Sequence, residues 1–307
     1  MSNQGLHIII TCYNEGTAII KLLDEIGKVL KNNTEEISIV VVDDGSVDET
    51  PRLLNNFRFE SECLHLRILW LEFNVGHQAA IEQGILFVGS CNAKHAIIMD
   101  GDGEDDPAAI LELIKLRSFD IVHVQRGKRE EGFGFQFAYS IYKSIFYHIS
   151  KRHMDFGNYC MINDKVMKII RSRSFIHLAA FLTKLKLSST SLTFNRRSRL
   201  FGKSKMSVSD LIQHAFRSFI EYAEEMVMIF LRIALILFLL FILTIGYILY
   251  LKFFTDEAIL GWTSTLGIGL LTSALLCLGF FTTGVLLLNQ SHLRSRQTTT
   301  ILYTIVK

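Results

Sequence analysis

Two long apolar segments near the C-terminal end constrain the fold of this chain more than any other feature. Met226–Leu251 carries a single charged residue, Arg232, and Ala258–Ser291 contains no Asp, Glu, Lys or Arg. A helix needs about 20 apolar residues to cross roughly 30 Å of hydrocarbon, and both segments are long enough. A buried helical pair inside a soluble domain is the alternative. Because only Lys252–Glu257 separates the segments, we expect a two-helix transmembrane hairpin.

The charges around this hairpin predict its orientation. The connector contains Lys252, Asp256 and Glu257, whereas Arg294, Arg296 and Lys307 follow the second segment. An excess of basic residues beside membrane spans favours the cytoplasmic side. We therefore expect an integral, two-pass membrane protein whose preceding domain and both termini are cytoplasmic.

Overall charge and cysteine content exclude several classes of protein. The 307-residue chain has a formal net charge of +2, so nothing indicates nucleic-acid binding. Its five cysteines are scattered and include no C-x-x-C pair. This argues against a disulfide framework or a structural zinc site, and it favours a reducing compartment.

Before residue 226, short apolar runs alternate with helix-like stretches. The expected strands are Leu6–Thr11, Ile37–Val42, Ile68–Phe73 and His95–Met99, and the expected helices include Gly16–Leu30 and Gln78–Val88. Such alternation is typical of an α/β domain with a mostly parallel sheet and helices on both faces. We place this domain at residues 1–205, a juxtamembrane amphipathic helix at 206–225, and the two transmembrane helices with a short cytoplasmic tail at 226–307.

Acidic or polar motifs follow three of the expected strands. They are Thr11–Glu15, Val42–Ser46 and Met99–Gly103. A single Asp-Gly pair is more often a plain turn than a site. Parallel strands, however, place their carboxyl ends along one edge, where such sheets bind ligands. Packing gives no reason to gather carboxylates there, so this edge is the candidate functional site.

Asp100 and Asp102 give the sharpest chemical signal. Two carboxylates at positions i and i+2, with glycines between and after them, can reach one cation. Mg²⁺ or Mn²⁺ prefers such oxygen ligands and completes its shell with water and substrate phosphates. A metal there would neutralise a diphosphate leaving group. Glu104, Asp105 and Asp106 follow as supporting groups or, as we favour for Asp106, as a cap of the next helix.

Four polar motifs occur in a fixed order along the domain. They are Tyr13-Asn14-Glu15, Asp43-Asp44-Gly45-Ser46, Asn74-Val75-Gly76 and Asp100-Gly101-Asp102. As an ordered set they resemble a family 2 glycosyltransferase with the GT-A fold. The resemblance covers roughly residues 6–210. It is greatest to the branch that includes dolichyl-phosphate mannose synthases and bacterial polyprenyl-phosphate glycosyltransferases.

This resemblance implies a UDP- or GDP-linked nucleotide-sugar donor, and catalytic and metal-binding roles for Asp100 and Asp102 with Mg²⁺ or Mn²⁺ as cofactor. It assigns donor binding to Tyr13, Asn14, Glu15, Asp43, Asp44, Ser46, Asn74, Gly76 and Asp100, with Glu15 and Asp44 at the base or ribose. The chain departs from the family at Thr11, where a proline is common, and in the acidic run after Asp102. These departures keep the metal ligands but weaken any inference about the sugar.

Two further segments resemble the acceptor side of that branch. Asp155, within Met154–Tyr159, is a candidate catalytic residue, either as a base for a sugar hydroxyl or as a positioning group. A basic loop follows later, and its Arg196, Arg199, Lys203 and Lys205 are expected to bind the phosphate of a polyisoprenyl phosphate. Attraction to anionic lipid headgroups is the other interpretation of this loop.

Two amphipathic stretches, Phe133–Ile149 and Val208–Met226, are expected to lie at the membrane interface, with ordinary core helices as the alternative. His77, His123 and His214 have no partner at metal-ligand spacing and are interpreted as structural or surface residues.

Together these features predict a membrane-anchored, inverting glycosyltransferase that transfers a sugar from a nucleotide sugar to a polyisoprenyl phosphate. A glycan or glycolipid acceptor is one alternative, and a non-catalytic membrane scaffold is another. Small residues in the second apolar segment could also support a homo-oligomer.

Overall fold

The chain divides into two compact units. The first, called here the sheet unit, comprises Met1–Phe146, Arg152–Glu221 and Thr300–Lys307, and the second, the hairpin unit, comprises Tyr147–Lys151 and Tyr222–Thr299. The computed structural model describes residues 5–126, 133–152, 156–194, 197, 215–255, 262–295 and 303–306.

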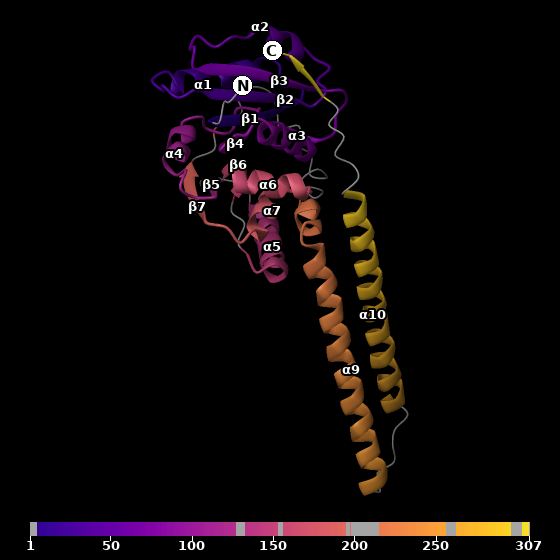
Figure 1. The fold of residues 1–307 in the computed structure, drawn as a ribbon. Helices are drawn as coiled ribbons and strands as arrows, with labels where there is room; N and C mark the ends of the chain where they lie inside the picture. The colour runs from indigo at the N-terminus through magenta and orange to yellow at the C-terminus, as the bar shows by residue number, and fades with distance from the viewer. Residues whose placement is uncertain are drawn as a thin grey trace. The chain divides into compact units, whose positions relative to one another are not determined.

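A sheet of eight strands forms the centre of the sheet unit (Figure 1). The strands are β1 Leu6–Cys12, β2 Ile37–Asp43, β3 Leu64–Leu71, β4 His95–Asp100, β5 Ile121–Arg126, β6 Phe156–Asn163, β7 Ser189–Phe194 and β8 Tyr303–Val306. They lie in the order β7-β5-β6-β4-β1-β2-β3-β8. The run β4-β1-β2-β3 is parallel, whereas β6 and β8 pair antiparallel with their neighbours. The expectation of a mostly parallel sheet is confirmed.

Helices cover both faces of this sheet. The core on one face includes side chains of α1 Thr17–Val29, α2 Thr50–Asn56 and α4 Ala109–Lys115, and the core on the other includes side chains of α3 His77–Ser90, α6 Asp164–Ser172 and α7 Leu178–Lys184. Ile8 and Ile10 of β1 pack in the first core and Ile9 in the second, because successive strand residues point to opposite faces. This explains the unbroken apolar runs of β1 and β2.

The strand ends differ in places from those expected. β3 begins at Leu64 rather than Ile68, because its first half still pairs with β2 although it contains the polar residues His65 and Arg67. Strands β5, β6 and β7 were not among the expected strands, and neither was the C-terminal strand β8. β8 pairs antiparallel with β3 at the edge of the sheet. The aromatic stretch from Phe133 is confirmed as a helix, α5 Phe133–Ser150.

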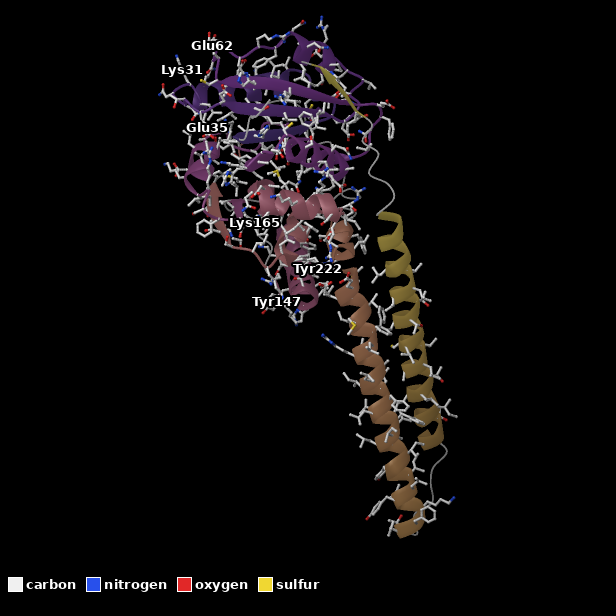
Figure 2. The ribbon with its side chains drawn as sticks, viewed as in Figure 1. Lys31, Glu35, Glu62, Tyr147, Lys165 and Tyr222 are labelled. Atoms are coloured by element: carbon white, nitrogen blue, oxygen red, sulfur yellow. The ribbon has the colours of Figure 1, made fainter. Side chains whose placement is uncertain are left out.

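A polar corner joins β5, β6 and β7 at the end of the sheet opposite the acidic motifs. Asp120, directly before β5, accepts hydrogen bonds from Ser188 Oγ (2.7 Å), Asn163 Nδ2 (2.6 Å) and Lys165 Nζ (3.1 Å). Lys165 is labelled in Figure 2. Because its hydrogen bonds are satisfied locally, we interpret this buried carboxylate as structural.

The hairpin unit contains two long helices, α9 Ala223–Phe254 with 32 residues and α10 Trp262–Ser295 with 34 residues. By length and composition, Ala223–Phe254 and Thr265–Leu288 are each apolar enough to cross a membrane. The two expected helices are therefore confirmed. The first extends beyond both ends of the predicted segment. The second, Trp262–Ser295, continues four residues past the predicted end, and residues 258–261 at the predicted start lie outside the described residues.

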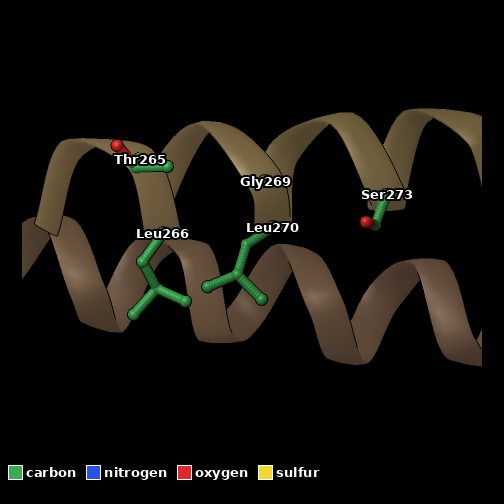
Figure 3. A pocket seen from close by; sticks show the side chains of 5 residues that line it. All are labelled: Thr265, Leu266, Gly269, Leu270 and Ser273. Atoms are coloured by element: carbon green, nitrogen blue, oxygen red, sulfur yellow. The ribbon is translucent and has the colours of Figure 1, made fainter. Parts of the chain in front are cut away.

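α9 and α10 pack closely against each other within this unit. A Cβ atom on Gly284 would lie 2.6 Å from Val227 Cγ2, so only glycine permits this approach without a shift. The rings of Phe230 and Phe280 lie 5.6 Å apart, centroid to centroid. Figure 3 shows a shallow hollow on α10, lined by Thr265, Leu266, Gly269, Leu270 and Ser273.

Candidate active site

The register of the sheet brings the three acidic motifs side by side. β1 lies between β2 and β4, with Cys12 opposite Asp43 and Thr11 opposite Asp100. Since these strands are parallel, their carboxyl ends lie at one edge, where open α/β sheets bind ligands. The Tyr13–Glu15, Asp43–Ser46 and Asp100–Asp102 segments thus share that edge.

Asp43 is buried at the end of β2 and holds the turn that follows. Its carboxylate accepts hydrogen bonds from the Ser46 hydroxyl and from Ser46 N (3.3 Å), and Cys12 Sγ lies 3.7 Å from Oδ1. Burial raises the pKa of Asp43, and the hydrogen bonds from Ser46 oppose this rise. Burial also raises the pKa of the Cys12 thiol. Cys12 is therefore a protonated core residue.

Asp44 joins the end of β2 to the loop after β3 through two hydrogen bonds. Its Oδ1 accepts a hydrogen bond from Val75 N (2.7 Å), and its Oδ2 accepts one from Gly76 N (3.0 Å). Burial raises the pKa of Asp44, while these two backbone bonds lower it. Gly45 has a positive φ of 71°, and a Cβ there would lie 2.9 Å from Asn74 N. Both oxygens of Asp44 therefore hold a loop, a role not predicted from the sequence.

The Tyr13–Glu15 loop is tied to the same turn. Asn14 N donates to Ser46 Oγ (2.8 Å), and Val47 N donates to Asn14 Oδ1 (2.9 Å). Asn14 has a φ of 54°, in the left-handed region that asparagine tolerates better than most residues. The Tyr13 side chain is exposed. An aromatic ring is thus open to solvent beside the buried carboxylates.

The loop that carries Asp100 and Asp102 packs tightly against β1. Gly101 N donates to Thr11 O (2.9 Å), and a Cβ on Gly101 would lie only 2.6 Å from that oxygen. Asp100 N donates to Oδ2 of the buried Asp105 (3.0 Å). Side-chain and backbone contacts therefore hold both ends of the loop against the sheet.

The chemistry of Asp100 and Asp102 fits a hard divalent cation. Both offer carboxylate oxygens, and Asp102 Oδ1 also accepts a hydrogen bond from Glu104 N (3.0 Å). Among the residues that the structure describes, no group of three or more His, Cys, Asp or Glu side chains is arranged to hold a metal ion. Water or substrate oxygens would have to complete a shell around a cation held here, as is usual for Mg²⁺.

His77 lies beside Asp100, although its spacing predicted only a structural or surface residue. Its Nε2 is 3.1 Å from Asp100 Oδ1 and 2.9 Å from Asn158 Nδ2, and its Nδ1 is 3.3 Å from Thr11 Oγ1. Burial lowers the pKa of His77, but the charge and hydrogen bond of Asp100, together with the charges of Asp102 and Asp105, raise it overall. Because the His77 side chain is 41% exposed, we regard these carboxylates as the main influence on its pKa. Its position directly after Asn74-Val75-Gly76 is the sequence signal that could have revealed it.

Arg197 is the part of the basic loop that the structure describes. Its Nη1 lies 2.6 Å from Glu25 Oε2, and its Nη2 lies 2.6 Å from Asp106 Oδ1. Asp106 Oδ1 also accepts a hydrogen bond from Ala108 N (2.9 Å). This bond lies within the turn before α4, whose N-cap residue is Ala108 and has no side-chain cap, so the expected capping of α4 by Asp106 is wrong. Arg197 thus links the basic loop to the acidic run. From the sequence, its neighbours Arg196 and Arg199 were expected instead, as phosphate-binding residues.

Several acceptor-side residues lie outside the described part of the chain. They are Asp155, Arg196, Arg199, Lys203 and Lys205. Of the expected juxtamembrane helix, residues 215–220 are helical, and 206–214 lie outside the described residues.

Three proteins illustrate which sequences this chain is similar to. An uncharacterized glycosyltransferase of Bacillus subtilis, YkcC, is 24% identical over 285 residues, covering 88% of this chain and 84% of the relative. An undecaprenyl-phosphate 4-deoxy-4-formamido-L-arabinose transferase of Photorhabdus laumondii is 27% identical, covering 68% and 65%. A dolichyl-phosphate beta-glucosyltransferase of Dictyostelium discoideum is 29% identical, covering 34% and 32%. The chain therefore spans less than two thirds of the last two relatives.

Solved structures of low sequence identity share the fold. Glucosyl-3-phosphoglycerate synthase from Mycobacterium tuberculosis, in complex with Mn²⁺, UDP-glucose and phosphoglyceric acid, has a TM-score of 0.54 at 11% identity, covering 72% of this chain and 79% of that one. Mannosyl-3-phosphoglycerate synthase from Rubrobacter xylanophilus has a TM-score of 0.51 at 13% identity, covering 72% and 73%. These likenesses agree with the expected GT-A fold.

The sequence profile described as Glycosyl transferase family 2 matches residues 7–178. The match extends from β1 through β6 and so includes all of the strand ends that form the acidic edge. The chain therefore belongs to glycosyl transferase family 2.

Proposed function

We propose that this glycosyltransferase transfers a sugar from a nucleotide-sugar donor to a polyisoprenyl phosphate at the cytoplasmic face of a membrane, with inversion at the anomeric carbon. The observation that carries the proposal is the gathering of the Tyr13–Glu15, Asp43–Ser46 and Asp100–Asp102 segments at one edge of a parallel sheet. Relatives that are undecaprenyl-phosphate and dolichyl-phosphate transferases support the choice of acceptor.

The donor nucleotide is proposed to bind at that edge. Its candidate contacts are Tyr13, Asn14, Glu15, Asp43, Asp44, Ser46, Asn74, Gly76 and Asp100. The exposed ring of Tyr13 can pack against a base. Asp43 and Asp44 act at least partly through the backbone, since their carboxylates hold the turn and the loop that border the site.

Asp100 and Asp102 are the residues that would hold Mg²⁺ or Mn²⁺. Such an ion, when bound, neutralises the charge that develops on a departing diphosphate. The chain's own part is to keep the two carboxylates in place. Gly101 and Asp105 anchor their loop to the sheet, and His77 lies against Asp100.

A lipid phosphate suits this site as the attacking group. It is already an anion near pH 7, so it needs no strong base. Its oxygen forms the new bond to the anomeric carbon as the bond to the nucleoside diphosphate breaks on the opposite face. We propose Arg196, Arg199, Lys203 and Lys205 as its phosphate-binding residues, and Asp155 as a positioning group.

The path of the chain supports a membrane hairpin. The chain leaves the sheet unit before α9 and returns to it after α10, where β8 pairs with β3. If both helices cross the bilayer, the sheet unit and the C-terminus lie on the same side. The basic residues after α10 favour the cytoplasm for that side.

Label transfer tests the proposed function. Membranes that contain the protein are incubated with a panel of radiolabelled UDP- and GDP-sugars, with and without a chelator, and then extracted with organic solvent. We expect chelator-sensitive label in a mild-acid-labile lipid. Asp102→Asn should reduce this label by about 100-fold or more, whereas Asp24→Asn, on the exposed face of α1, should not.

Other outcomes of this assay would contradict the proposal. Label in a glycan without labelled lipid would move the acceptor to a glycan or glycolipid. Nucleotide binding without transfer of any sugar would favour a scaffold. Full activity in Asp102→Asn would remove the proposed metal site from the mechanism.

A further inference from the structure

The C-terminal strand β8 lies at the edge of the sheet, beside β3 (Figure 1). Tyr303 is opposite Leu71, and Val306 is opposite Ile68. Although this strand follows the two apolar helices in the sequence, it belongs to the sheet unit. Without it, β3 would be an edge strand with a row of unpaired backbone N–H and C=O groups.

The pairing covers the half of β3 that leads to the candidate active site. β8 pairs with Ile68–Leu71. Within the described ranges, the first half of the strand, from Leu64 to Arg67, has a partner only on the β2 side. An unpaired strand end frays readily. β8 therefore supports the part of β3 in which fraying would disturb the site.

The residues after Leu71 form the loop held by Asp44. Val75 N and Gly76 N donate to the two oxygens of that carboxylate, at 2.7 Å and 3.0 Å. The loop also lies tightly against the turn after β2, since a Cβ on Gly45 would be 2.9 Å from the Phe73 carbonyl carbon. A displacement at the end of β3 would therefore move the groups that hold Asp44.

We propose that β8 is a positioning element of the nucleotide-binding edge. It holds the end of β3, and through β3 it holds the Phe73–Gly76 loop and Asp44. The nucleotide-binding edge thus depends on a segment that follows both apolar helices in the sequence. The effect on donor binding rests on the proposed function, whereas the effect on β3 does not.

A proline scan across Tyr303, Thr304, Ile305 and Val306 in the full-length protein, in detergent, tests this inference. In an antiparallel pair, alternate residues direct their backbone N–H toward the partner strand. Proline at one alternate pair of positions removes bonds to β3, while proline at the other pair replaces outward N–H groups that an edge strand can lose. Deletion of Lys307 alone serves as the matched control.

The first readout is amide hydrogen exchange, which needs no ligand. We expect the disruptive prolines to speed exchange of the β3 amides and of Val75 and Gly76 by at least about 10-fold. The other prolines and the Lys307 deletion should leave exchange within about 2-fold of the wild type. Exchange in the β5 and β6 amides should stay unchanged in every variant.

The second readout is binding of UDP and GDP by calorimetry. For the nucleotide that the wild type binds, the disruptive prolines should raise the Kd by about 10-fold, and a peptide of residues 300–307 added in excess should restore it. In the transfer assay the same variants should raise the KM for the donor and leave the KM for the lipid unchanged. A general loss of fold would affect both substrates.

Two results would overturn the inference. If the β3 amides exchange at the same rate in the disruptive and in the other proline variants, β8 does not support β3. Faster exchange in β3 with an unchanged nucleotide Kd would show that the strand pairs but does not position the nucleotide-binding edge. A wild-type protein that binds neither nucleotide would instead refute the proposed function, and the exchange pattern would still decide whether β8 supports β3.

Discussion

Gly101 shows how closely single residues are constrained at the acidic edge. A side chain at this position has no room, because its Cβ would lie 2.6 Å from Thr11 O and 3.0 Å from Cys12 Cβ. The first of these atoms belongs to the backbone of a central strand, so it cannot move aside cheaply. The loop that carries Asp100 and Asp102 would have to shift instead.

Gly101→Ala should therefore reduce both stability and activity. We expect the free energy of unfolding to fall by about 1–3 kcal/mol, as is typical of overpacked positions, and sugar transfer to fall by at least about 10-fold. Thermal unfolding in detergent and the label-transfer assay measure the two effects. Gly89→Ala in α3 is the control, since its Cβ would meet Met167 at an ordinary 3.9 Å. Equal behaviour of the two variants would contradict the geometry.

His7 predicts a pH dependence of stability. The residue is fully buried in β1, and burial, followed by the charge of Arg67, lowers its pKa from 6.5 to about 4. Between these pH values the unfolded chain binds a proton at His7 that the folded chain does not. The contribution of His7 to the free energy of unfolding is therefore fully present above pH 6.5 and is lost as the pH falls toward 4.

His7→Leu should remove this loss. When the pH is lowered from 7.5 to 5, the free energy of unfolding of the wild type should fall by about 2 kcal/mol more than that of the variant. Denaturant unfolding at both pH values provides the measurement. His65→Leu, at an exposed position of β3, should retain the wild-type dependence. If both variants lose it, His7 is not its source.

At the residue scale, the sequence predicted which motifs lie together better than it predicted the contacts that they make. Ordered motifs identified the edge, because carboxylates and glycines after buried strands have few structural reasons to recur. The two bonds from Asp44 to the loop after β3, and the approach of His77 to Asp100, arise from contacts between separate loops. No periodicity records such contacts, so they could not be read from spacing.

Elements were predictable where both faces of a strand are buried. β1, β2 and β4 are runs of apolar residues between turn signals, and all three were expected with nearly the observed ends. The first half of β3 and the whole of β5, β6, β7 and β8 were missed. β7, β8 and the first half of β3 lie toward the sheet edges, where pairing depends on a neighbouring strand and less on apolar patterning. β5 and β6 pair antiparallel with each other, outside the β-α-β alternation on which the expectation rested.

The close packing of α9 and α10 gives a prediction at the scale of elements. Gly284→Leu should push the helices apart, because a Cβ there would lie 2.6 Å from Val227 Cγ2. The measurement is disulfide yield between Phe230→Cys and Phe280→Cys, in a background without native cysteines. We expect the yield to fall severalfold in Gly284→Leu. It should not change in Gly279→Leu, where a Cβ would meet nothing within 4 Å.

For the molecule as a whole, the order of the two units along the chain limits how the protein can sit in a membrane. The sheet unit contains residues from both ends of the chain, and the hairpin unit lies between them. A single membrane crossing would separate β8 from β3, which are paired. Membrane insertion is therefore compatible with this fold only if the hairpin crosses an even number of times or not at all.

Cysteine labelling can distinguish these arrangements. In intact cells that produce a protein without native cysteines, a membrane-impermeant maleimide should label Glu257→Cys in the connector but should not label Ser2→Cys or Lys307→Cys until the membrane is permeabilised. Labelling of the connector requires two crossings, and protection of both termini requires the cytoplasmic orientation favoured by the basic residues after α10. If the connector and both termini are all protected in intact cells and all labelled after permeabilisation, α9 and α10 do not span the bilayer. Opposite behaviour of Ser2→Cys and Lys307→Cys would contradict the pairing of β8 with β3, because no chain with termini on opposite sides can form that strand pair.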